Sequence, residues 1–475
     1  MFDLRQAFDW LSAACLYGDG SCRVHGVCTD SRSLKAGDLF VALRGERFDA
    51  HDFIERAQQA GAAAVMFERL VPGLRAPALR VPDTRRALGE LAAGWRRRFD
   101  LPLITVAGSN GKTTVKEMIS GILAEHAGDA GRLATRGNLN NDIGVPLTLF
   151  RLGDAHRAAV LELGTNHPGE IAHLAKLARP TVALVTNAQR EHQEFLDGVE
   201  GSARENGASI AALADDGIAV FPGDDSQASL WRALAGSRRC VEFGLTAPGE
   251  AAAGEAASRS GASGQPARFE VSAPADARPQ DFELSIGGRT LSARLAIDGL
   301  HSVRNALAAA ASAYAIGIDA DTIVRGLARF RPAVGRLARL NTPSGAALID
   351  DSYNANPDSV RAAIDVLAGC AGRRVLVLGD MGEVGAQGPQ FHREVGDYAR
   401  QRGIEHLLAL GEATRASAAA FGPGAEHFGS VEPLIERARE LVAAGTSTLV
   451  KGSRFMRMER VVAALAGSGA AGGHA

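Results

Sequence analysis

The sequence predicts an α/β protein of three domains, and three observations support this prediction. First, its 475 residues are more than one hydrophobic core ordinarily holds. Second, apolar segments typical of buried strands alternate with segments of helical periodicity, which favours parallel sheets. Third, the alternation occurs in two separate series. We therefore predict a small α/β module over residues 1–100, a central α/β domain over 101–335 and a Rossmann-like α/β domain over 336–475.

The first predicted domain is a mixed segment. "DLFVAL", 38–43, and "GAAAVMFE", 61–68, are rich in the apolar residues of buried strands. "TRRALGELAAGWRRRF", 84–99, has apolar residues at helical spacing and is predicted to lead into the next domain.

The central domain is predicted to begin with the buried strand "LPLITVAG", 101–108, followed by the helix "TTVKEMISGILAEH", 113–126. A further helix is expected over 300–317, and the low-complexity stretch 247–267 is expected to be a flexible surface insertion. The remaining predicted strands of this domain are 158–164, 181–187 and 217–223.

The third domain repeats the alternation of strands and helices without repeating the sequence of the second. Its predicted strands are "AALIDD", 346–351, "RRVLVLGD", 373–380, "HLLALG", 406–411, and "STLVKGS", 447–453.

Composition and charge exclude several classes of protein. Hydrophobic residues make up 46% and charged residues 22% of the chain, as in soluble globular proteins. The net charge of −2 provides no field that would hold nucleic acid or an anionic membrane. No apolar run reaches transmembrane length, and the start lacks the basic region of a signal peptide. Five cysteines without a C-x-x-C pair indicate reduced thiols. We expect a cytoplasmic protein that enters no membrane and binds no nucleic acid.

A glycine-rich loop lies between the first strand and helix of the central domain. The standard phosphate-loop spacing would place a glycine at position 106, which is Val106, so the loop has the shorter pattern G-x-x-G-K-T-T. A helix that begins after such a loop points free N–H groups at an anion. Lys112 would bind β- and γ-phosphates and Thr113 would bind Mg²⁺, which predicts a P-loop-type ATP-binding domain. The alternative is an ordinary helix start. The predicted ATP-binding residues of the loop are Gly108, Ser109, Asn110, Gly111, Lys112, Thr113 and Thr114.

Other candidate residues follow predicted strands, and from the residues alone each has a second interpretation. Glu162 is a carboxylate suited to Mg²⁺, but it could equally be a capping or salt-bridged residue. A lone histidine such as His192 is more often structural than a metal ligand. The asparagine-rich stretches 136–146 and 350–359 are turn formers or substrate contacts. Lys451 and Arg454, in "LVKGSRFMRME", form either an anion site or a basic helix start.

Six stretches together resemble the Mur ligase family. They are "GSNGKTT", "GNLNNDIGVP", "LELGTNHPGEI", "DDSYNANPDS", "VLGDMGEVG" and "LVKGSRFMRME". The resemblance runs along the chain except for the low-complexity stretch. The glycine loop alone would also fit folylpolyglutamate synthetases, whereas the stretches at 350–359 and 449–459 are more specific. The Asp-Asn-Pro-Arg element of the sister ligase that adds the third peptide residue is absent.

The resemblance implies an ATP-dependent amide ligase of peptidoglycan precursor synthesis. Its expected substrates are UDP-N-acetylmuramoyl-tripeptide and D-alanyl-D-alanine, with ATP and Mg²⁺ as cofactors and a monomer as the working unit. ATP would phosphorylate the tripeptide carboxylate, and the dipeptide amine would displace the phosphate. The competing interpretations are another ligase of the superfamily and an NTPase whose output is hydrolysis itself.

The resemblance also implies roles for individual residues. Lys112, Glu162 and His192 would be catalytic, with Thr113 and Glu162 as ligands of one Mg²⁺ and His192 as ligand of a second. Asn305, Arg336 and Asp351 would bind ATP. The substrate-binding residues would be Ser31 and Arg32 at the uridine end, Asn138, Asn140 and Asn141 at the peptide, and Tyr353, Asn354, Asn356 and Lys451 at the incoming dipeptide and the reacting groups.

Two departures from the family pattern stand out. Many Mur ligases carry a lysine, modified to a carbamate, where this chain has Asn206 in "SARENGASI". Asparagine cannot form a carbamate, and our hypothesis is that Glu205 or a solvent anion partly replaces it. The milder departure is Ser302, where related chains often have asparagine.

Overall fold

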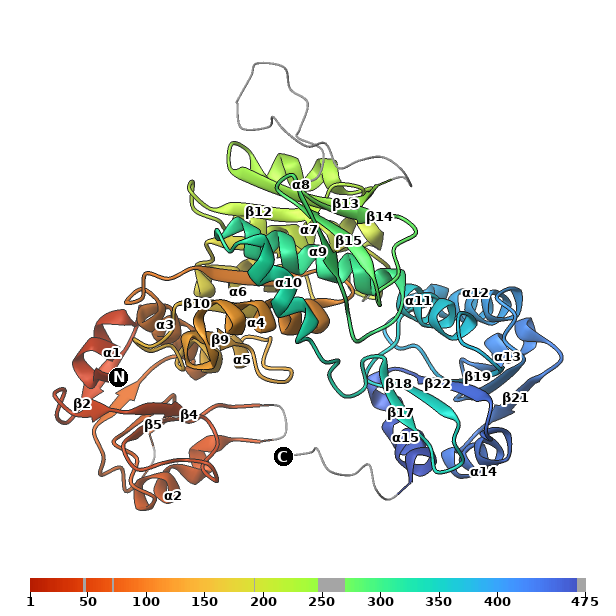
Figure 1. The fold of residues 1–475 in the computed structure, drawn as a ribbon. Coiled ribbons are helices and arrows are strands. Elements are labelled where there is room, and N and C mark those ends of the chain that lie inside the picture. The colour runs from red at the N-terminus through yellow and green to blue at the C-terminus, as the bar shows by residue number, and fades with distance from the viewer. Residues whose placement is uncertain (46–47, 71, 192, 247–269, 468–475) are drawn as a thin grey trace.

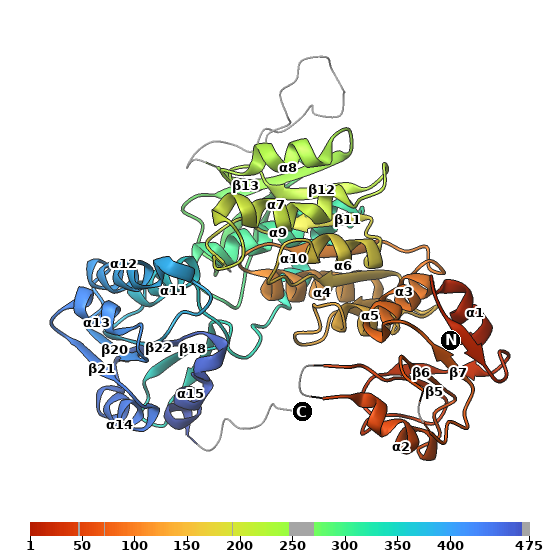
Figure 2. The same cartoon turned by 180° about the vertical axis from the view of Figure 1, so that it is seen from behind.

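The computed structural model describes residues 1–45, 48–70, 72–191, 193–246 and 270–467, so the predicted insertion at 247–267 lies outside the described residues. Three large sheets form three domains (Figure 1). The central domain lies at the top of the view, and the N-terminal and C-terminal domains lie below it on opposite sides, as Figure 2 shows from behind. The predicted three-domain α/β fold is confirmed.

The N-terminal domain contains a five-stranded sheet in the order β2-β7-β6-β5-β4. Strands β4 to β7 are parallel, and β2 pairs antiparallel with β7. The predicted strands near 38–43 and 61–68 are β5 and β6. The strands are β1 (Phe2–Asp3), β2 (Cys15–Tyr17), β3 (Arg23–Val24), β4 (Gly26–Cys28), β5 (Asp38–Val41), β6 (Ala64–Phe67) and β7 (Ala78–Arg80), and the helices are α1 (Leu4–Trp10), η1 (Ala50–Phe53), α2 (Ile54–Gln59) and α3 (Thr84–Arg96).

The central domain contains a nine-stranded sheet in the order β16-β15-β14-β13-β12-β11-β8-β10-β9. Its strands are β8 (Leu103–Ala107), β9 (Arg132–Ala134), β10 (Ala158–Glu162), β11 (Val182–Val185), β12 (Ile218–Pro222), β13 (Arg239–Thr246), β14 (Val271–Pro274), β15 (Phe282–Ile286) and β16 (Arg289–Ala293). The strands from β9 to β14 pair in parallel, as predicted. No strand was predicted at β15 and β16, which continue the sheet as an antiparallel hairpin.

Helices cover both faces of the central sheet. Helices α4, α9 and α10 pack on one face, and α6, α7 and α8 on the other (Figures 1 and 2). The apolar side chains of α4 recur at helical spacing, and those facing the sheet are fully buried. The helices are α4 (Lys112–Ala127), η2 (Asp129–Gly131), α5 (Gly144–Leu149), α6 (Glu170–Ala178), α7 (Gly198–Ala211), α8 (Ala228–Ala235), α9 (Leu300–Ala315) and α10 (Ala320–Ala328).

The C-terminal domain contains a six-stranded sheet in the order β17-β18-β22-β19-β20-β21, parallel except for the pairing of β17 with β18. All four strands predicted here are present. The strands are β17 (Ala338–Asn341), β18 (Ala347–Asp351), β19 (Arg373–Gly379), β20 (His406–Leu410), β21 (Ala425–Phe428) and β22 (Thr446–Lys451), and the helices are α11 (Pro357–Ala368), η3 (Gly385–Gln387), α12 (Gly388–Gln401), α13 (Arg415–Phe421), α14 (Val431–Leu441), η4 (Arg454–Met456) and α15 (Glu459–Ala466).

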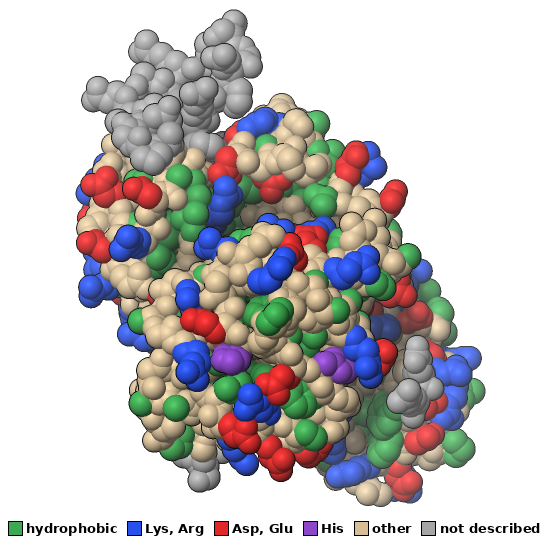
Figure 3. Space-filling view, turned by 90° about the vertical axis from the view of Figure 1, so that its right-hand side faces the viewer, with side chains coloured by type: hydrophobic (Ala, Val, Ile, Leu, Met, Phe, Trp, Pro, Cys, Tyr) green, Lys and Arg blue, Asp and Glu red, His purple; other side chains and the backbone are tan. Residues whose placement is uncertain are grey.

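Acidic and basic side chains alternate over the face that includes the C-terminal domain, and no broad area of one sign stands out there (Figure 3). Within the described ranges, no helix is long and apolar enough to cross a membrane.

Candidate active site

The ends of several parallel strands converge on one cavity. Strands β11, β8 and β10 are neighbours in the central sheet, and β18 and β22 are neighbours in the C-terminal sheet. In such sheets the carboxyl ends of the strands are the usual place for a ligand. Here they surround a cavity of about 1030 Å³, whose wall includes residues of all three domains.

The phosphate loop connects β8 to α4 in a conformation that requires glycine at two positions. Gly108 has φ +131° and Gly111 has φ +83°, values that residues with a side chain rarely adopt. A Cβ at Gly108 would collide with Thr186, and one at Gly111 would collide with Asn305. The 16-residue α4 begins directly after Gly111, so its first N–H groups face the loop.

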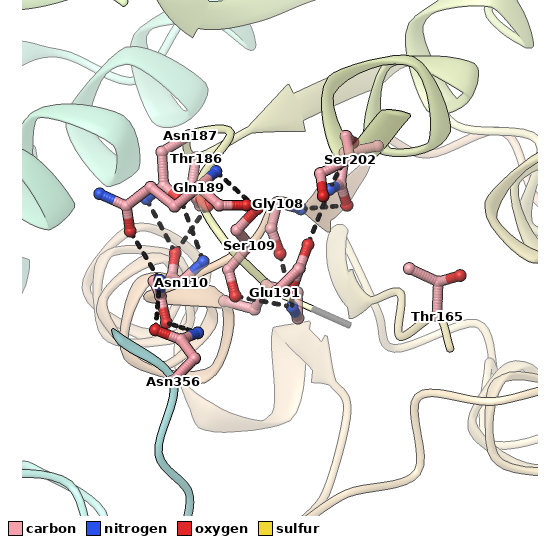
Figure 4. Close-up of polar contacts among 12 residues, drawn as sticks. Gly108, Ser109, Asn110, Thr165, Thr186, Asn187, Gln189, Glu191, Ser202 and Asn356 are labelled. Carbon is pink, nitrogen blue, oxygen red and sulfur yellow. Dashed lines mark hydrogen bonds and ion pairs between the residues drawn. The ribbon is translucent and has the colours of Figure 1, made fainter. Parts of the chain in front are cut away.

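The loop is held in place by the segment that follows β11. Backbone N–H groups of Ser109 and Asn110 donate to the carbonyl and side-chain oxygens of Asn187, at 3.2 and 2.9 Å. Thr186 Oγ1 donates to Asn110 O at 2.7 Å, and Gln189 N donates to Ser109 Oγ at 2.9 Å (Figure 4). This support was not predicted, because the segment is separated from the loop by about 80 residues of sequence.

Lys112 lies back against its own loop and beside a buried carboxylate. Its Nζ donates to Gly108 O at 2.5 Å, to Ser109 O at 3.2 Å and to Glu191 Oε2 at 3.2 Å. The other oxygen of Glu191 accepts from Asn206 Nδ2 at 3.0 Å. The Lys112 side chain is 17% exposed and that of Glu191 only 4%, so this charge pair lies at the inner wall of the cavity.

Glu162, at the end of β10, has one oxygen engaged and one free among the described residues. Asn140 Nδ2 donates to Oε1 at 2.8 Å, whereas the buried Oε2 has no hydrogen-bond partner there. A buried carboxylate oxygen facing a cavity is suited to a cation. Mg²⁺ takes oxygen ligands and is usually held by one or two protein groups together with phosphates, so Glu162 and the Thr113 hydroxyl fit it. Among the described residues, no three His, Cys, Asp or Glu side chains form a site for a metal held by protein alone.

The C-terminal domain reaches the loop through Asn356. Asn356 Nδ2 donates to Asn110 Oδ1 at 2.9 Å, and Asn110 Nδ2 donates back to Asn356 Oδ1 at 3.3 Å. Asn356 also caps α11, because its Oδ1 accepts from Ser359 N at 2.8 Å. The residue is therefore both a helix cap and a contact between domains.

Two basic groups of the C-terminal part border the same cavity. Lys451, at the end of β22, donates to Asp351 Oδ2 at 2.5 Å and to Asn354 O at 3.0 Å. The guanidinium of Arg336 lies 4.1 Å from the centre of the Tyr353 ring. Both side chains line the cavity that the phosphate loop also lines.

Arg190 joins the central domain to two helices of the C-terminal domain. Its guanidinium donates to Asp358 on α11 at 2.5–3.1 Å and to Glu394 on α12 at 2.8 and 3.1 Å. Its backbone N donates to Asp358 at 2.9 Å. Hydrogen bonds from Arg190 and Arg361 hold the pKa of Glu394 below its ordinary value. Arg190 was not singled out in the sequence.

The cavity brings together most of the predicted site residues. Those that line it are Ser109, Asn110, Gly111, Lys112, Thr113, Asn138, Asn140, Asn141, Glu162, Arg336, Tyr353, Asn354, Asn356 and Lys451. Gly108, Thr114, Asn305 and Asp351 do not line the cavity, although Asn305 lies beside Gly111 and Asp351 accepts from Lys451.

The predicted uridine-side residues do not line this cavity. Ser31 and Arg32 lie in the N-terminal domain, where Arg32 donates to Asp30 at 2.7 Å. His192 lies outside the described residues. The roles assigned to these three residues stay predictions.

The hypothesis that Glu205 takes the place of a carbamate was wrong. Both of its oxygens accept from the start of α6: Oε2 from Gly169 N at 2.7 Å and Oε1 from Ile171 N at 2.8 Å. Glu205 is therefore used by these backbone donors, whereas the carboxylate that contacts Asn206 belongs to Glu191.

Three family models match the chain in order. "Mur ligase family, catalytic domain" matches residues 23–96, "Mur ligase middle domain" 106–313, and "Mur ligase, glutamate ligase domain" 335–454.

Curated relatives cover nearly the whole chain. The UDP-N-acetylmuramoyl-tripeptide–D-alanyl-D-alanine ligase of Escherichia coli is 41% identical over 93% of this chain and 94% of its own length. The ligase of the same name from Bacillus subtilis is 33% identical over 92% of each.

Solved structures agree with the fold. A crystal structure of MurF from Acinetobacter baumannii has a TM-score of 0.87, is 33% identical and covers 98% of both chains. That of the MurF ligase from Thermotoga maritima in complex with ADP, 24% identical, has a TM-score of 0.78 over 93% and 96% of the two chains. The models, the relatives and the shared fold agree, and the chain therefore belongs to the Mur ligase family of enzymes.

Proposed function

We propose that this enzyme uses ATP to join D-alanyl-D-alanine to the terminal carboxylate of UDP-N-acetylmuramoyl-tripeptide, forming the pentapeptide precursor of peptidoglycan. The names of the curated relatives support this choice of substrates. We assign uridine binding to residues 1–100, ATP binding to 101–335 and part of the acceptor site to 336–475. The reaction would take place in the cytoplasm, where ATP is available, and one chain would contain the whole site.

One observation carries the proposal: the phosphate loop and cationic side chains of a second domain line a single cavity. Lys112 comes from the loop of the central domain, and Lys451 and Arg336 come from the C-terminal part of the chain. A carboxylate and the γ-phosphate of ATP are both anions and repel each other. Cations on both sides reduce this repulsion and allow the two groups to approach in line.

The chemistry has two steps. In the first, an oxygen of the tripeptide carboxylate forms a bond to the γ-phosphorus as the bond to ADP breaks, which gives an acyl phosphate. In the second, the dipeptide amine attacks the acyl carbon, inorganic phosphate leaves, and the nitrogen loses a proton. Holding the reactants together in one cavity supplies much of the rate through orientation.

The described residues suggest how each step is assisted. Lys112 would exchange its loop carbonyls for phosphate oxygens, since a charge-assisted hydrogen bond to an anion is stronger. Asn140 orients Glu162 by donating to Oε1, which leaves Oε2 without a partner among the described residues. Bound Mg²⁺, held by Glu162 and Thr113, would neutralise phosphate charge. Asn110 and Asn356 join the two domains around the loop and help to exclude water from the acyl phosphate.

The test is phosphate release and product mass with purified enzyme, omitting ATP, the tripeptide precursor or the dipeptide in turn. We expect release only with all three, and the pentapeptide as product. Steady release with ATP alone would indicate an NTPase instead. Activity with a different acid and amine would leave the chemistry intact and change the substrate.

Glu162→Gln keeps the size of the side chain and removes its charge. We expect the turnover to fall by about 10²–10³-fold, the usual effect of removing one electrostatic contact to the reacting groups. Glu283→Gln, on the exposed side of β15, is the matched control and should leave turnover unchanged.

A further inference from the structure

The turn that follows β22 places an arginine and a phenylalanine at the cavity, and the proposed mechanism assigns neither a role. Arg454 and Phe455 belong to η4, and both line the cavity. The Arg454 side chain is 64% exposed and Phe455 is 63% exposed. The turn therefore offers a cation and an apolar ring to a molecule that enters the cavity.

The backbone of this turn is fixed to the neighbouring loops of the sheet. Ser453 N donates to Asp380 O at 3.0 Å, and Ser453 Oγ donates to Ala355 O at 3.1 Å. Ser453 Oγ also accepts from Gly382 N at 2.7 Å. A Cβ at Gly382 would lie 2.7 Å from the Phe455 ring, so the ring rests directly on this glycine. The two exposed side chains are thus presented from a well-held backbone.

The end of the neighbouring strand supplies an aromatic contact for Arg454. Strands β18 and β22 lie side by side, with Asp351 opposite Lys451 (Figure 1). Tyr353, two residues past β18, also lines the cavity, and the Arg454 guanidinium lies 5.5 Å from the centre of its ring. Arg336 contacts the same ring at 4.1 Å. Two guanidinium groups therefore meet at one aromatic ring of the cavity wall, where their summed charge attracts an anion.

The cations at this part of the cavity differ in how far they are engaged. Lys451 is already paired with Asp351. Arg336 has the ATP-binding role that the family resemblance implies, which leaves Arg454. Its one ion pair among the described residues is with Glu459, at 3.3 Å through Nη1. A guanidinium has five N–H donors, so most of those of Arg454 are available to a ligand.

The acceptor of the proposed reaction needs such a cation. D-Alanyl-D-alanine carries a carboxylate at the end opposite its reacting amine, and two extended residues span at most about 7 Å. Since the amine has to reach the acyl carbon beside the phosphate loop, the carboxylate remains within the same cavity. A carboxylate that leaves water without a cationic partner is costly. The two methyl groups of the dipeptide gain free energy from an apolar surface.

We propose that Arg454 binds the carboxylate of the acceptor dipeptide and that Phe455 contacts its methyl groups, so that this turn selects the acceptor. The inference rests on the proposed function, because it takes D-alanyl-D-alanine as the acceptor. A planar guanidinium matches a carboxylate through two parallel hydrogen bonds. Because this contact lies at the far end of the dipeptide from the reacting amine, it acts on the choice of acceptor rather than on the chemical step.

The test compares two acceptors that differ by one charge. D-Alanyl-D-alaninamide has the size and the methyl groups of D-alanyl-D-alanine but lacks the carboxylate. With saturating Mg²⁺-ATP and UDP-N-acetylmuramoyl-tripeptide, the wild-type enzyme should use the amide with a kcat/KM about 10–100-fold lower, the usual effect of losing a hydrogen bond to a charged group. Arg454→Gln should raise the KM for the dipeptide by a similar factor, leave kcat little changed, and use both acceptors about equally.

Three further variants separate this role from a structural one. Arg457→Gln removes an exposed arginine of the same turn that does not line the cavity, and it should behave as the wild type. Glu459→Gln removes the partner of Arg454 and should keep the preference for the acid, whereas it should resemble Arg454→Gln if the pair only stabilises the turn. Phe455→Ala should raise the KM for both acceptors alike, by about 3–10-fold, because the methyl groups are common to both.

Several outcomes would overturn the inference. They are a wild-type enzyme that uses the amide as well as the acid, an Arg454→Gln enzyme that keeps the wild-type preference, and a loss of the preference in Arg336→Gln but not in Arg454→Gln. Unchanged KM values in Phe455→Ala would overturn the part that concerns the methyl groups. A wild-type enzyme that makes no pentapeptide from D-alanyl-D-alanine would instead refute the proposed function, so the two failures are distinguishable.

Discussion

The N-terminal and C-terminal domains join the central domain in different ways. One continuous apolar cluster runs from Phe2 and Trp95 in the N-terminal domain to Leu103, Val145 and Leu161 in the central one. In contrast, the buried residues of both apolar clusters in the C-terminal domain lie within 346–466. The partly buried Leu337 packs against both the central core and one of these clusters, and the hydrogen-bonded contacts between the two domains are polar. Exposing a buried apolar surface to water costs much free energy. The groups of a polar contact between domains can instead form hydrogen bonds with water when the contact breaks. We infer that the N-terminal domain is fixed and that the C-terminal domain can open and close.

The largest expected effect comes from the apolar contact. Trp95 packs against Phe2 and Phe99, and its Nε1 donates to Leu152 O at 3.2 Å. Trp95→Ala should lower the free energy of unfolding by about 3–5 kcal/mol, because it leaves a large cavity at the junction. The measurement is urea unfolding followed by circular dichroism.

The exposed Leu70 is the control for this experiment, and Leu70→Ala should change the stability by less than about 0.5 kcal/mol. If Trp95→Ala unfolds the N-terminal domain alone and leaves the central transition at its wild-type midpoint, the two domains do not share one core.

The second prediction concerns Arg190, which makes the most extensive polar contact between the central and C-terminal domains. Arg190→Ala leaves Asp358 and Glu394 without their shared cation, and should disfavour the closed arrangement by about 2–5 kcal/mol. We expect a larger radius of gyration by small-angle X-ray scattering and a lower turnover, with little change in the unfolding of the central domain.

Arg437 is a matched control, because it pairs with Glu426 and Glu440 inside the C-terminal domain. Arg437→Ala should leave the radius of gyration unchanged. An Arg190→Ala enzyme with wild-type dimensions and turnover would show that closure does not depend on this contact.

The contacts of Arg190 and Glu191 show what the sequence could and could not predict. The phosphate loop and the strands that surround the site were predictable, since apolar runs and glycine spacing are local signals. Arg190 and Glu191 were not, because their partners are distant: Asp358 lies 168 residues from Arg190, and Lys112 lies 79 residues from Glu191. Only the folded chain brings such polar pairs together.

The missed hairpin and the choice of Glu205 had signals that were present in the sequence. The antiparallel β15–β16 hairpin has Gly287-Gly288 between two segments of strand-forming residues, a recognised hairpin turn. The hypothesis named Glu205, the sequence neighbour of Asn206, and did not consider Glu191. Consecutive residues of a helix point in different directions, however, so the neighbour of Asn206 faces away from the loop.

The third prediction uses pH to weaken the same polar contact. The pKa of Glu394 is lowered chiefly by its hydrogen bond from Arg190 and also by that from Arg361, with Asp358 nearby as a like charge. A carboxyl group whose pKa is lowered in the closed state stabilises that state at pH values above the ordinary pKa of the group, which is 4.5. This stabilisation is lost as the pH falls through the lowered pKa.

The radius of gyration should therefore grow as the pH falls below about 4.5, at pH values where the enzyme remains folded. Glu394→Gln should be more open than the wild type at neutral pH and should show less of this dependence on pH. If Glu394→Gln keeps the wild-type dependence on pH, another carboxyl group causes the change in the radius of gyration.

The smallest expected effect comes from the exposed pair between the same two domains. Arg339, on β17, donates to Asp298 at 2.5 Å, but its side chain is 55% exposed, compared with 22% for Arg190. Arg339→Ala should shift the closed arrangement by only about 0.2–1 kcal/mol, and this shift should disappear at high salt because water and ions screen exposed charges. The effect of Arg190→Ala should persist under the same conditions. The measurement is small-angle X-ray scattering of both variants at low and high salt. If Arg339→Ala and Arg190→Ala change the radius of gyration equally, and salt reduces both changes equally, burial does not set the strength of this interface.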